Sequence, residues 1–201
     1  MLLYKYRNLN NFDRIKDIIQ NKRFYASAYT DLNDPMEGIF KYNAKYRDKY
    51  SDKLAEIKIN KDNLKICSLS KTCEETLMWS HYADGERGIV IGINRDSLKR
   101  KYRDKLKPIK YKGIPFISDD EINNIQAEEI LSYKKRGWRY EKEIRVFTTE
   151  DFITVEIEKV ILGSRITSDN ALHIKKLIDE VNKNSSQQIE IEKLENVLER
   201  A

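Results

Sequence analysis

The stretch GIVIGI, residues 88–93, decides the fold, because it is apolar and rich in β-branched side chains over its whole length. Such a run is typical of a strand that is buried on both of its faces. The spacing of apolar residues predicts a helix before it, over residues 72–83, and a short helix after it, over residues 95–103. This part of the chain is therefore expected to place a buried strand between two helices.

Further strands and helices are expected on either side of this stretch. A turn at Asn33-Asp34-Pro35 is expected to begin one of the helices, since proline is favoured at a first helical position. Helices and short strands in mixed order predict an α+β fold, with mixed, mostly antiparallel sheets and flanking helices. The sequence predicts strands over residues 2–7, 23–29, 65–70, 107–111, 141–148, 154–162 and 188–194, and helices over residues 12–20, 41–63, 118–133 and 169–182.

The composition is that of a polar globular protein. Of the 201 residues, 40% are apolar and 35% are charged, so a core can form beneath a strongly charged surface. The length fits a single domain over residues 1–201. No apolar run approaches the roughly 18 residues that a membrane span needs, and Cys67 and Cys73 form no metal or disulfide motif. We therefore expect a cytoplasmic protein with no membrane partner, while the sequence leaves the oligomeric state open.

Positive charge is concentrated in the first three quarters of the chain. Residues 150–201 hold 11 acidic and seven basic side chains, so residues 1–149 carry about +9 against a net charge of +5 for the whole chain. The densest basic stretch, residues 95–112, holds nine Lys and Arg against two Asp, with Tyr102 and Tyr111 among them. A basic face with interleaved aromatic rings can bind a nucleic-acid backbone. The alternative is an ordinary solvated, lysine-rich surface.

Four short clusters of residues stand out in the sequence. They are residues 3–7 (LYKYR), 24–37 (FYASAYTDLNDPME), 78–92 (MWSHYADGERGIVIG) and 138–145 (WRYEKEIR). Together these clusters resemble an uncharacterised bacterial family that is catalogued as domain of unknown function 2971. The resemblance implies a family-like body over residues 1–163, followed by a C-terminal tail of one helix and one strand over residues 164–201.

The order of these clusters is also similar to that of the ADP-ribosyltransferase superfamily. Its members place an Arg or His on the first strand, a Ser or Tyr on the second and a Glu on a later strand. This similarity implies an ADP-ribosyltransferase-like fold with NAD as substrate, in which Arg7 binds the NAD phosphates and Ser27 supports the nicotinamide side of the pocket. Glu143 would then stabilise the oxocarbenium-like transition state at the ribose. Glu141 is the alternative catalytic carboxylate, and we prefer Glu143 because it lies deeper in the predicted strand.

Residues of the predicted strand 141–148 and several aromatic residues complete the candidate site. Side chains two apart in a strand point to one face, so Glu141, Glu143 and Arg145 are expected to line one surface. The further candidates for contact with NAD are the aromatic Tyr4, Tyr6, Trp79 and Tyr82, which could stack on its rings, together with His81, Asn33, Asp34 and Arg145.

Each of these assignments has a structural alternative. Arg7 could form an ion pair with Glu141 or Asp34, and His81 could be a partly buried histidine whose hydrogen bonds are satisfied within the fold. The turn at residues 33–35 is explained by helix capping alone. Glu37 follows Asp34 by three residues, which is the spacing of a capping box.

The expected function is transfer of ADP-ribose from NAD to a macromolecule, either a nucleic acid, as the basic body favours, or a protein. A role as a toxin or an anti-phage effector would suit such chemistry. One alternative is a metal-dependent nuclease that holds Mg²⁺ with Asp34, Glu37, Glu141 and Glu143, although Lys142 is expected on the opposite strand face. The other is a non-catalytic sensor that binds a nucleotide or a protein. The leading hypothesis assigns no residue to a metal.

Overall fold

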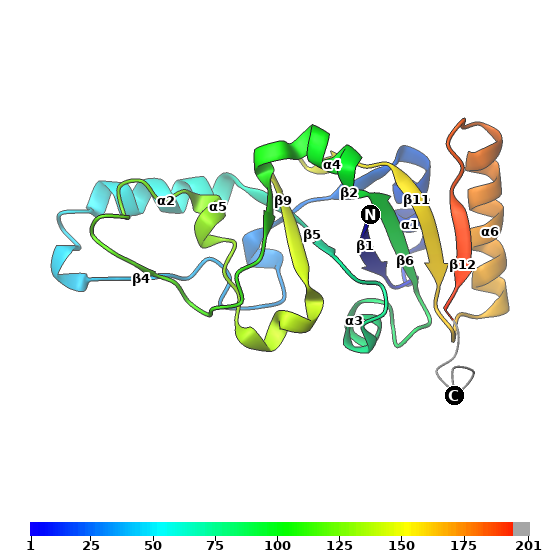
Figure 1. The fold of residues 1–201 in the computed structure, drawn as a ribbon, viewed down its shortest axis with the longest axis horizontal. Helices are drawn as coiled ribbons and strands as arrows, with labels where there is room; N and C mark the ends of the chain where they lie inside the picture. The colour runs from blue at the N-terminus through cyan, green and yellow to red at the C-terminus, as the bar shows by residue number, and fades with distance from the viewer. Residues whose placement is uncertain (195–201) are drawn as a thin grey trace. The chain divides into compact units, whose positions relative to one another are not determined.

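The computed structural model describes residues 1–194 and divides them into two compact units (Figure 1). Unit 1 is formed by residues 1–24, 69–103 and the chain from residue 154 onward, and unit 2 by residues 25–68 and 104–153. Both units combine helices with short strands, so the expected α+β class with mixed, mostly antiparallel sheets is confirmed. The single domain expected from the chain length stays a prediction.

Unit 1 contains a sheet built around the stretch that opened the sequence analysis. Its order is β12 (Glu190–Lys193), β11 (Ile157–Leu162), β6 (Ile89–Asn94) and β1 (Leu2–Arg7). β6 is antiparallel to both β1 and β11, whereas β12 is parallel to β11. The isoleucine and valine side chains of β6 are fully buried, so the buried strand expected at this position is confirmed.

The helices of unit 1 are α1 (Phe12–Asn21), α3 (Thr76–Tyr82), α4 (Arg95–Tyr102) and α6 (Ser168–Lys183). The side chain of Asn11 caps α1 by accepting a hydrogen bond from the backbone N–H of Arg14 at 3.1 Å. α1 packs against α6, and each helix buries an isoleucine-rich face. The predicted C-terminal tail therefore forms an integral part of unit 1 as far as Leu194, and residues 195–201 lie outside the described residues.

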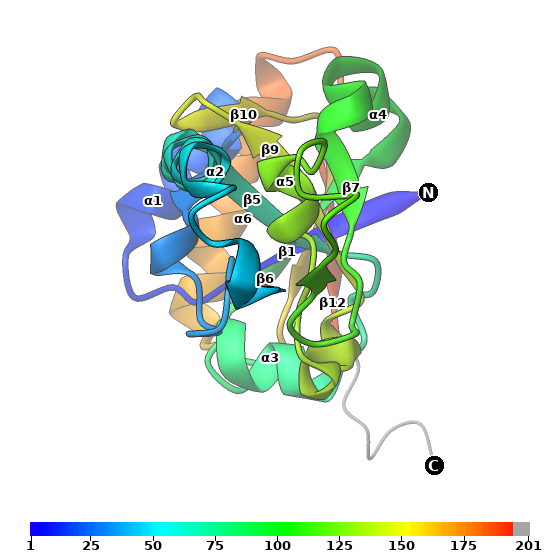
Figure 2. The same cartoon turned by 90° about the vertical axis from the view of Figure 1, so that its left-hand side faces the viewer.

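Unit 2 holds shorter elements. β3 (Ser27–Ala28) pairs with β5 (Lys65–Ser70), and β7 (Leu106–Pro108) pairs antiparallel with β9 (Glu143–Thr148). β5 and β9 are neighbours in the sheet, and Ile66 of β5 packs with Phe147 of β9 in the core. The helix α2 (Ser51–Asn63) lies beside α5 (Ala127–Ile130) (Figure 2). The strands β4 (Lys41–Tyr42) and β8 (Phe116–Ile117) pair with each other. The short helices of this unit are η1 (Tyr29–Asp31), η2 (Ala44–Tyr46) and η4 (Arg136–Glu141).

Four elements contain the points where the chain passes between the two units, and β5 is one of them. β2 (Arg23–Tyr25) and β10 (Phe152–Thr154) pair with each other, and η3 (Arg103–Lys105) follows α4.

Several predicted elements are shorter than expected or absent. The strand expected over residues 23–29 is interrupted at Ala26, and the strand expected over residues 154–162 begins only at Ile157. No helix follows Pro35, because the Asp34 side chain accepts a hydrogen bond from the N–H of Met36 and holds the chain in a turn. The helix expected over residues 118–133 is reduced to the four residues of α5.

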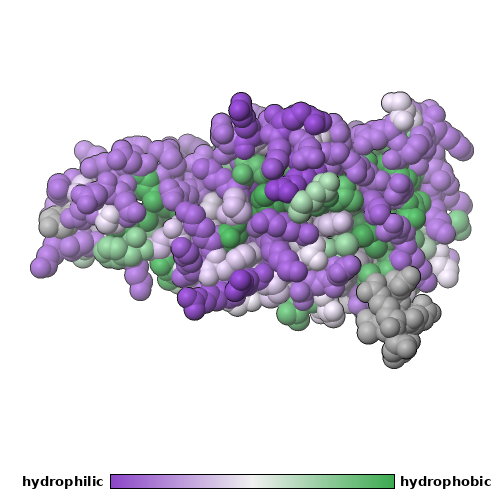
Figure 3. Space-filling model, in the orientation of Figure 1, coloured by the Kyte–Doolittle hydropathy of each residue, from purple (hydrophilic) through white to green (hydrophobic). Residues whose placement is uncertain are grey.

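Polar side chains dominate the surface, as the composition predicts. Hydrophilic residues cover most of the face shown in Figure 3, with apolar residues in separate patches. None of the helices among residues 1–194 is long and apolar enough to cross a membrane.

Candidate functional site

Unit 2 buries a cluster of five charged side chains, which we call the charged cluster. It consists of Glu37, Lys134, Glu141, Glu143 and Arg145, each of which is between 1% and 7% exposed. Glu143 and Arg145 lie on β9, and Glu141 ends η4 just before it. The other two members come from loops, Glu37 from the turn after Asp34 and Lys134 from the segment that follows α5. Charged side chains are almost never buried to this extent unless they are paired.

Arg145 is paired with two carboxylates at once. Its Nε donates to Glu143 Oε1 at 2.7 Å, and its Nη2 donates to Glu143 Oε2 at 3.2 Å. The same guanidinium donates to both oxygens of Glu37, at 2.9 and 2.6 Å. The remaining N–H of Nη1 reaches the carbonyl oxygen of Leu131 at 2.6 Å. All five donors of the guanidinium therefore have an acceptor, and the side chain is held in one orientation.

Lys134 is the second cation of the charged cluster. Its Nζ donates to Glu141 at 2.5 Å and to Glu143 at 3.2 Å, and lies 3.9 Å from a carboxylate oxygen of Glu37. The ammonium group also lies 4.9 Å from the centre of the Trp138 ring, which adds a cation–π contact. Lys134 thus connects all three carboxylates through a single nitrogen atom.

The pairing determines the charge state of Glu143. Burial by itself would raise the pKa of this carboxyl group, because the charged form loses its hydration. The charges of Arg145 and Lys134, with hydrogen bonds from Arg145 and Ser68, outweigh burial and lower the pKa of Glu143 to about 2. Burial likewise lowers the pKa of Lys134, but Glu143 and Glu141 overcome it and raise that pKa above its ordinary value.

The backbone around Lys142 explains how two glutamates so close in sequence reach the same place. Glu141 and Glu143 do not both lie on the strand, because β9 begins at Glu143. Lys142 between them has a φ of 45°, which turns the chain sharply before the strand starts. The Tyr111 hydroxyl then accepts a hydrogen bond from the Glu143 N–H at 2.6 Å. The side chain of Lys142 is exposed, but Lys142 lies before the strand and not on its opposite face as the sequence predicts.

The charged cluster has an excess of acidic groups. Three glutamates and two cations give it a formal charge of −1. Moving such groups out of water costs several kcal/mol per ion, and apolar residues of similar volume usually stabilise a core at least as well. Strongly shifted pKa values of this kind are found preferentially at functional sites. A fixed, buried carboxylate group with surplus negative charge can stabilise a positive charge brought next to it.

The structure brings together only some of the residues proposed from the sequence. Glu143 and Arg145 meet in the charged cluster as alternation along a strand predicts, whereas Glu141 reaches it from the end of η4. Glu37 and Lys134 were not assigned to an NAD site from the sequence: the capping-box spacing gave Glu37 a purely local explanation, and nothing in the sequence around Lys134 marks it. The other predicted residues of unit 2 are Ser27 on the short strand β3, the exposed Asn33 and the buried Asp34.

The remaining predicted residues belong to unit 1. Tyr4, Tyr6 and Arg7 lie on β1, and Trp79, His81 and Tyr82 lie on α3.

Two of these six side chains have clear structural roles. Trp79 is 1% exposed, donates from its ring nitrogen to the carbonyl oxygen of Cys73 at 2.7 Å, and meets the Tyr6 ring edge to face at 5.4 Å. Tyr6 is also buried and donates its hydroxyl hydrogen to the carbonyl oxygen of Thr72 at 3.1 Å. This pair therefore anchors α3 to β1. Their contacts with NAD stay predictions, as do those of Tyr4, Arg7, His81 and Tyr82.

The carboxylates considered for a metal site are arranged differently from metal ligands. Among the described residues, no group of three or more His, Cys, Asp and Glu side chains is placed so that it could hold a metal ion. Glu37, Glu141 and Glu143 instead face the two cations of the charged cluster. The metal-dependent nuclease is therefore an alternative for which residues 1–194 supply no set of metal ligands.

Comparison with known proteins adds one finding. A family model described as "Protein of unknown function (DUF2971)" matches residues 78–146. The matched part contains the clusters 78–92 and 138–145, whereas residues 3–7 and 24–37 lie outside it. Comparisons with curated proteins and with solved structures find no match. The resemblance to a domain of unknown function is thus confirmed over residues 78–146, and the chain is similar to that family there.

Proposed function

We propose that the protein transfers ADP-ribose from NAD to a macromolecular acceptor and that the charged cluster of unit 2 carries the reaction. The observation that supports this proposal is the pair Glu141 and Glu143, buried next to Lys134 and Arg145 in a cluster with a formal charge of −1. In this reaction the bond between ribose C1 and the nicotinamide nitrogen breaks, and its electron pair leaves with nicotinamide. The acceptor then bonds to C1 and loses a proton.

The negative charge of the glutamates in the charged cluster suits this reaction. Positive charge builds up at the ribose as nicotinamide leaves, and a carboxylate that is held ionised stabilises it most where water is excluded. Glu143 is such a carboxylate, since Arg145 keeps its pKa low and fixes both of its oxygens. Glu141 supplies the second negative group through Lys134.

Lys134 is the group that has to move for a substrate to reach Glu141 and Glu143. Its ammonium now occupies the position next to both carboxylates, at 2.5 and 3.2 Å. Arg145 is fixed by five hydrogen bonds, whereas Lys134 ends in a single charged nitrogen on a four-carbon stem with rotatable bonds. In our proposal Lys134 gives way to the substrate and Arg145 stays in place.

The first test is thermal unfolding of the full chain with and without NAD. A ligand that binds only the folded protein stabilises it by about 2.7 kcal/mol at a hundredfold excess over its dissociation constant. The expected result is a higher midpoint with NAD and a smaller increase in Arg7→Ala, because Arg7 is the predicted phosphate ligand. An unchanged midpoint at millimolar NAD would contradict the proposal.

The second test follows labelled ADP-ribose from NAD into nucleic-acid and protein acceptors. Glu143→Gln is expected to lower the rate by about a hundredfold or more, the usual effect of losing a fixed electrostatic partner of the transition state. Glu37→Gln is the matched control, because it removes the same charge from the same Arg145 without touching the proposed catalytic group. Equal rates in the two variants, both shown to be folded by circular dichroism, would refute the role of Glu143.

A further inference from the structure

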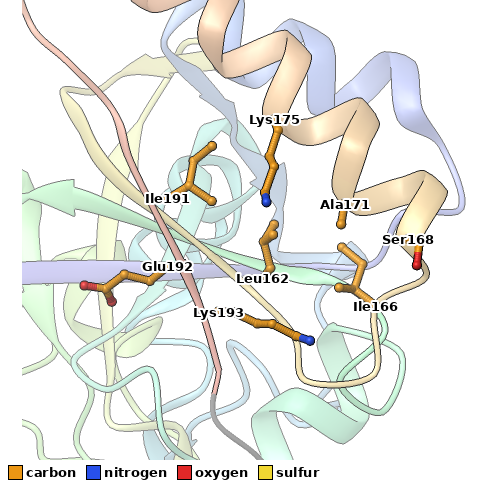
Figure 4. A pocket seen from close by; sticks show the side chains of 8 residues that line it. All are labelled: Leu162, Ile166, Ser168, Ala171, Lys175, Ile191, Glu192 and Lys193. Atoms are coloured by element: carbon orange, nitrogen blue, oxygen red, sulfur yellow. The ribbon is translucent and has the colours of Figure 1, made fainter.

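Unit 1 contains a pocket that includes none of the candidate site residues. Its volume is about 300 Å³, and it lies among β11, β12 and the first turns of α6 (Figure 4). β11, α6 and β12 form a unit of two parallel strands joined by a helix. Leu162 ends β11 and Lys193 ends β12, so the pocket is at the carboxyl ends of both strands. In open parallel α/β sheets ligands bind outside the carboxyl ends of the strands, and this parallel pair has the same local arrangement.

One part of the pocket lining is apolar. Leu162, Ile166, Ala171 and Ile191 present only aliphatic side chains to it. They come from four successive segments, namely β11, the loop after it, α6 and β12, so each segment contributes one aliphatic side chain to the lining (Figure 4). A lining of this kind favours a ligand with an apolar body.

The other part of the lining is positively charged. Lys175 of α6 and Lys193 of β12 both point their ammonium groups toward the pocket (Figure 4). No carboxylate among residues 1–194 lies within 4 Å of either ammonium group. The acidic lining residue, Glu192, is turned away and pairs with Lys159 at 2.6 Å. Two positive charges therefore face the pocket without a negative partner in this part of the chain.

We propose that this pocket binds a small organic anion, with its phosphate or carboxylate between Lys175 and Lys193 and its apolar part against Leu162 and Ile191. Charge complementarity selects the anionic group, and the aliphatic lining selects the apolar body. The proposal is independent of ADP-ribosyl transfer, because the pocket shares no residue with the charged cluster.

Phenyl phosphate is a suitable probe, since it joins a phosphate to one aromatic ring. Binding to the full chain is measured by titration calorimetry at low ionic strength, alongside inorganic phosphate and phenol as the two halves of the probe. We expect phenyl phosphate to bind at least about tenfold more tightly than either half. Lys175→Gln and Lys193→Gln are each expected to weaken binding about three- to tenfold, the effect of one charge-assisted contact at an accessible position.

Two further variants make the test specific to the pocket. Lys176→Gln removes the same charge from the neighbouring, exposed position of α6 that does not line the pocket, and it is expected to leave phenyl phosphate binding unchanged. Ala171→Phe fills the pocket and is expected to abolish binding, with thermal unfolding as the check on its fold. The proposal is overturned if phenyl phosphate fails to bind, if inorganic phosphate binds as tightly, or if Lys176→Gln weakens binding as much as Lys175→Gln.

Discussion

Arg145 shows most clearly what a single residue contributes to unit 2. Its guanidinium spans Glu37 in one loop and Glu143 on its own strand, and it also satisfies the carbonyl oxygen of Leu131. A planar group with five fixed donors can do this, and a lysine ammonium with three donors cannot. The side chain therefore acts as a structural connection and as the electrostatic partner of two carboxylates.

Arg145→Lys is expected to destabilise the protein although it keeps the charge. Loss of the bidentate contacts leaves buried carboxylate oxygens without donors, which costs about 3 kcal/mol or more. Urea unfolding measures the change. Arg100→Lys on the exposed surface of α4 is the control and is expected to stay within about 0.5 kcal/mol of the parent. A cost below about 1 kcal/mol for Arg145→Lys would show that lysine can satisfy both carboxylates.

The charged cluster could be predicted only in part from the sequence. Alternation along a strand correctly places Glu143 beside Arg145, because this is a local property of the backbone. Glu37 meets Arg145 across 108 positions of sequence, and such a contact has no local signal. Glu141 was expected beside Glu143 because the sequence placed both on one strand. It does lie in the charged cluster, but it reaches it from the end of η4.

Among the elements, β6 depends on a glycine at its entry. A Cβ atom on Gly88 would overlap the carbonyl oxygen of Arg7 and also come within 3.1 Å of the backbone of Ala83. These are backbone atoms, which cannot move aside without shifting β1 or the end of α3. Glycine at this position therefore allows β6 to start beside the end of β1.

Gly88→Ala is accordingly expected to lower the free energy of unfolding by about 2 kcal/mol or more. Gly137→Ala is the matched control, because its Cβ would have no neighbour within 4 Å. That variant is expected to be neutral or slightly stabilising, since alanine reduces the freedom of the unfolded chain. Chemical unfolding measures the free energy of unfolding of both variants. Equal values would mean that β1 adjusts to the methyl group added at residue 88.

The start of α1 gives a second prediction at this scale. Asn11→Ala removes the acceptor for the N–H of Arg14 and is expected to cost about 1 kcal/mol. Asn11→Ser restores an acceptor of the same kind and should recover most of the loss. Thermal unfolding measures both variants, and an Asn11→Ala midpoint equal to that of the parent would assign no stabilising role to the cap.

The success of element prediction depended on how much local structure each segment specifies. The apolar stretch of β6, the capped α1 and the amphipathic α6 were predicted well, because propensity, pattern and packing agree in each. Residues 118–133 carry helically spaced isoleucines, but Ile122 and Ile125 pack with Tyr50 and Ile117 from a chain of turns. The two asparagines between them are poor helix formers, and tertiary packing determined the outcome.

For the whole molecule, the charged cluster makes stability depend on pH. The pKa of Glu143 is about 2 in the folded state against an ordinary 4.5, so the carboxylate favours folding. A depressed acid pKa contributes stability that is complete above pH 4.5 and is lost as the pH falls toward 2. The full loss in the free energy of unfolding is about 3 kcal/mol, because a tenfold change in an acid dissociation constant corresponds to about 1.4 kcal/mol.

Hydrogen exchange can locate this effect, because all five members of the charged cluster belong to unit 2. Between pH 5 and pH 2.5, the amides of β9 are expected to lose protection more steeply than those of β6 in unit 1, after correction for the intrinsic exchange rate. Glu143→Gln, which cannot ionise, should remove most of the difference. Parallel loss of protection in β9 and β6 would show instead that the two units open together.

The division of the chain has a consequence for its synthesis. All residues of unit 2 precede residue 154, whereas β11, α6 and β12 of unit 1 follow it. On the ribosome, unit 2 can therefore be completed while β6 still lacks its partner β11 on one edge. A nascent chain stalled before residue 154 should resist protease in unit 2 and be cut near β6. An apolar strand with an open edge is also what chaperones bind, so the order of translation itself makes unit 1 the part that needs protection.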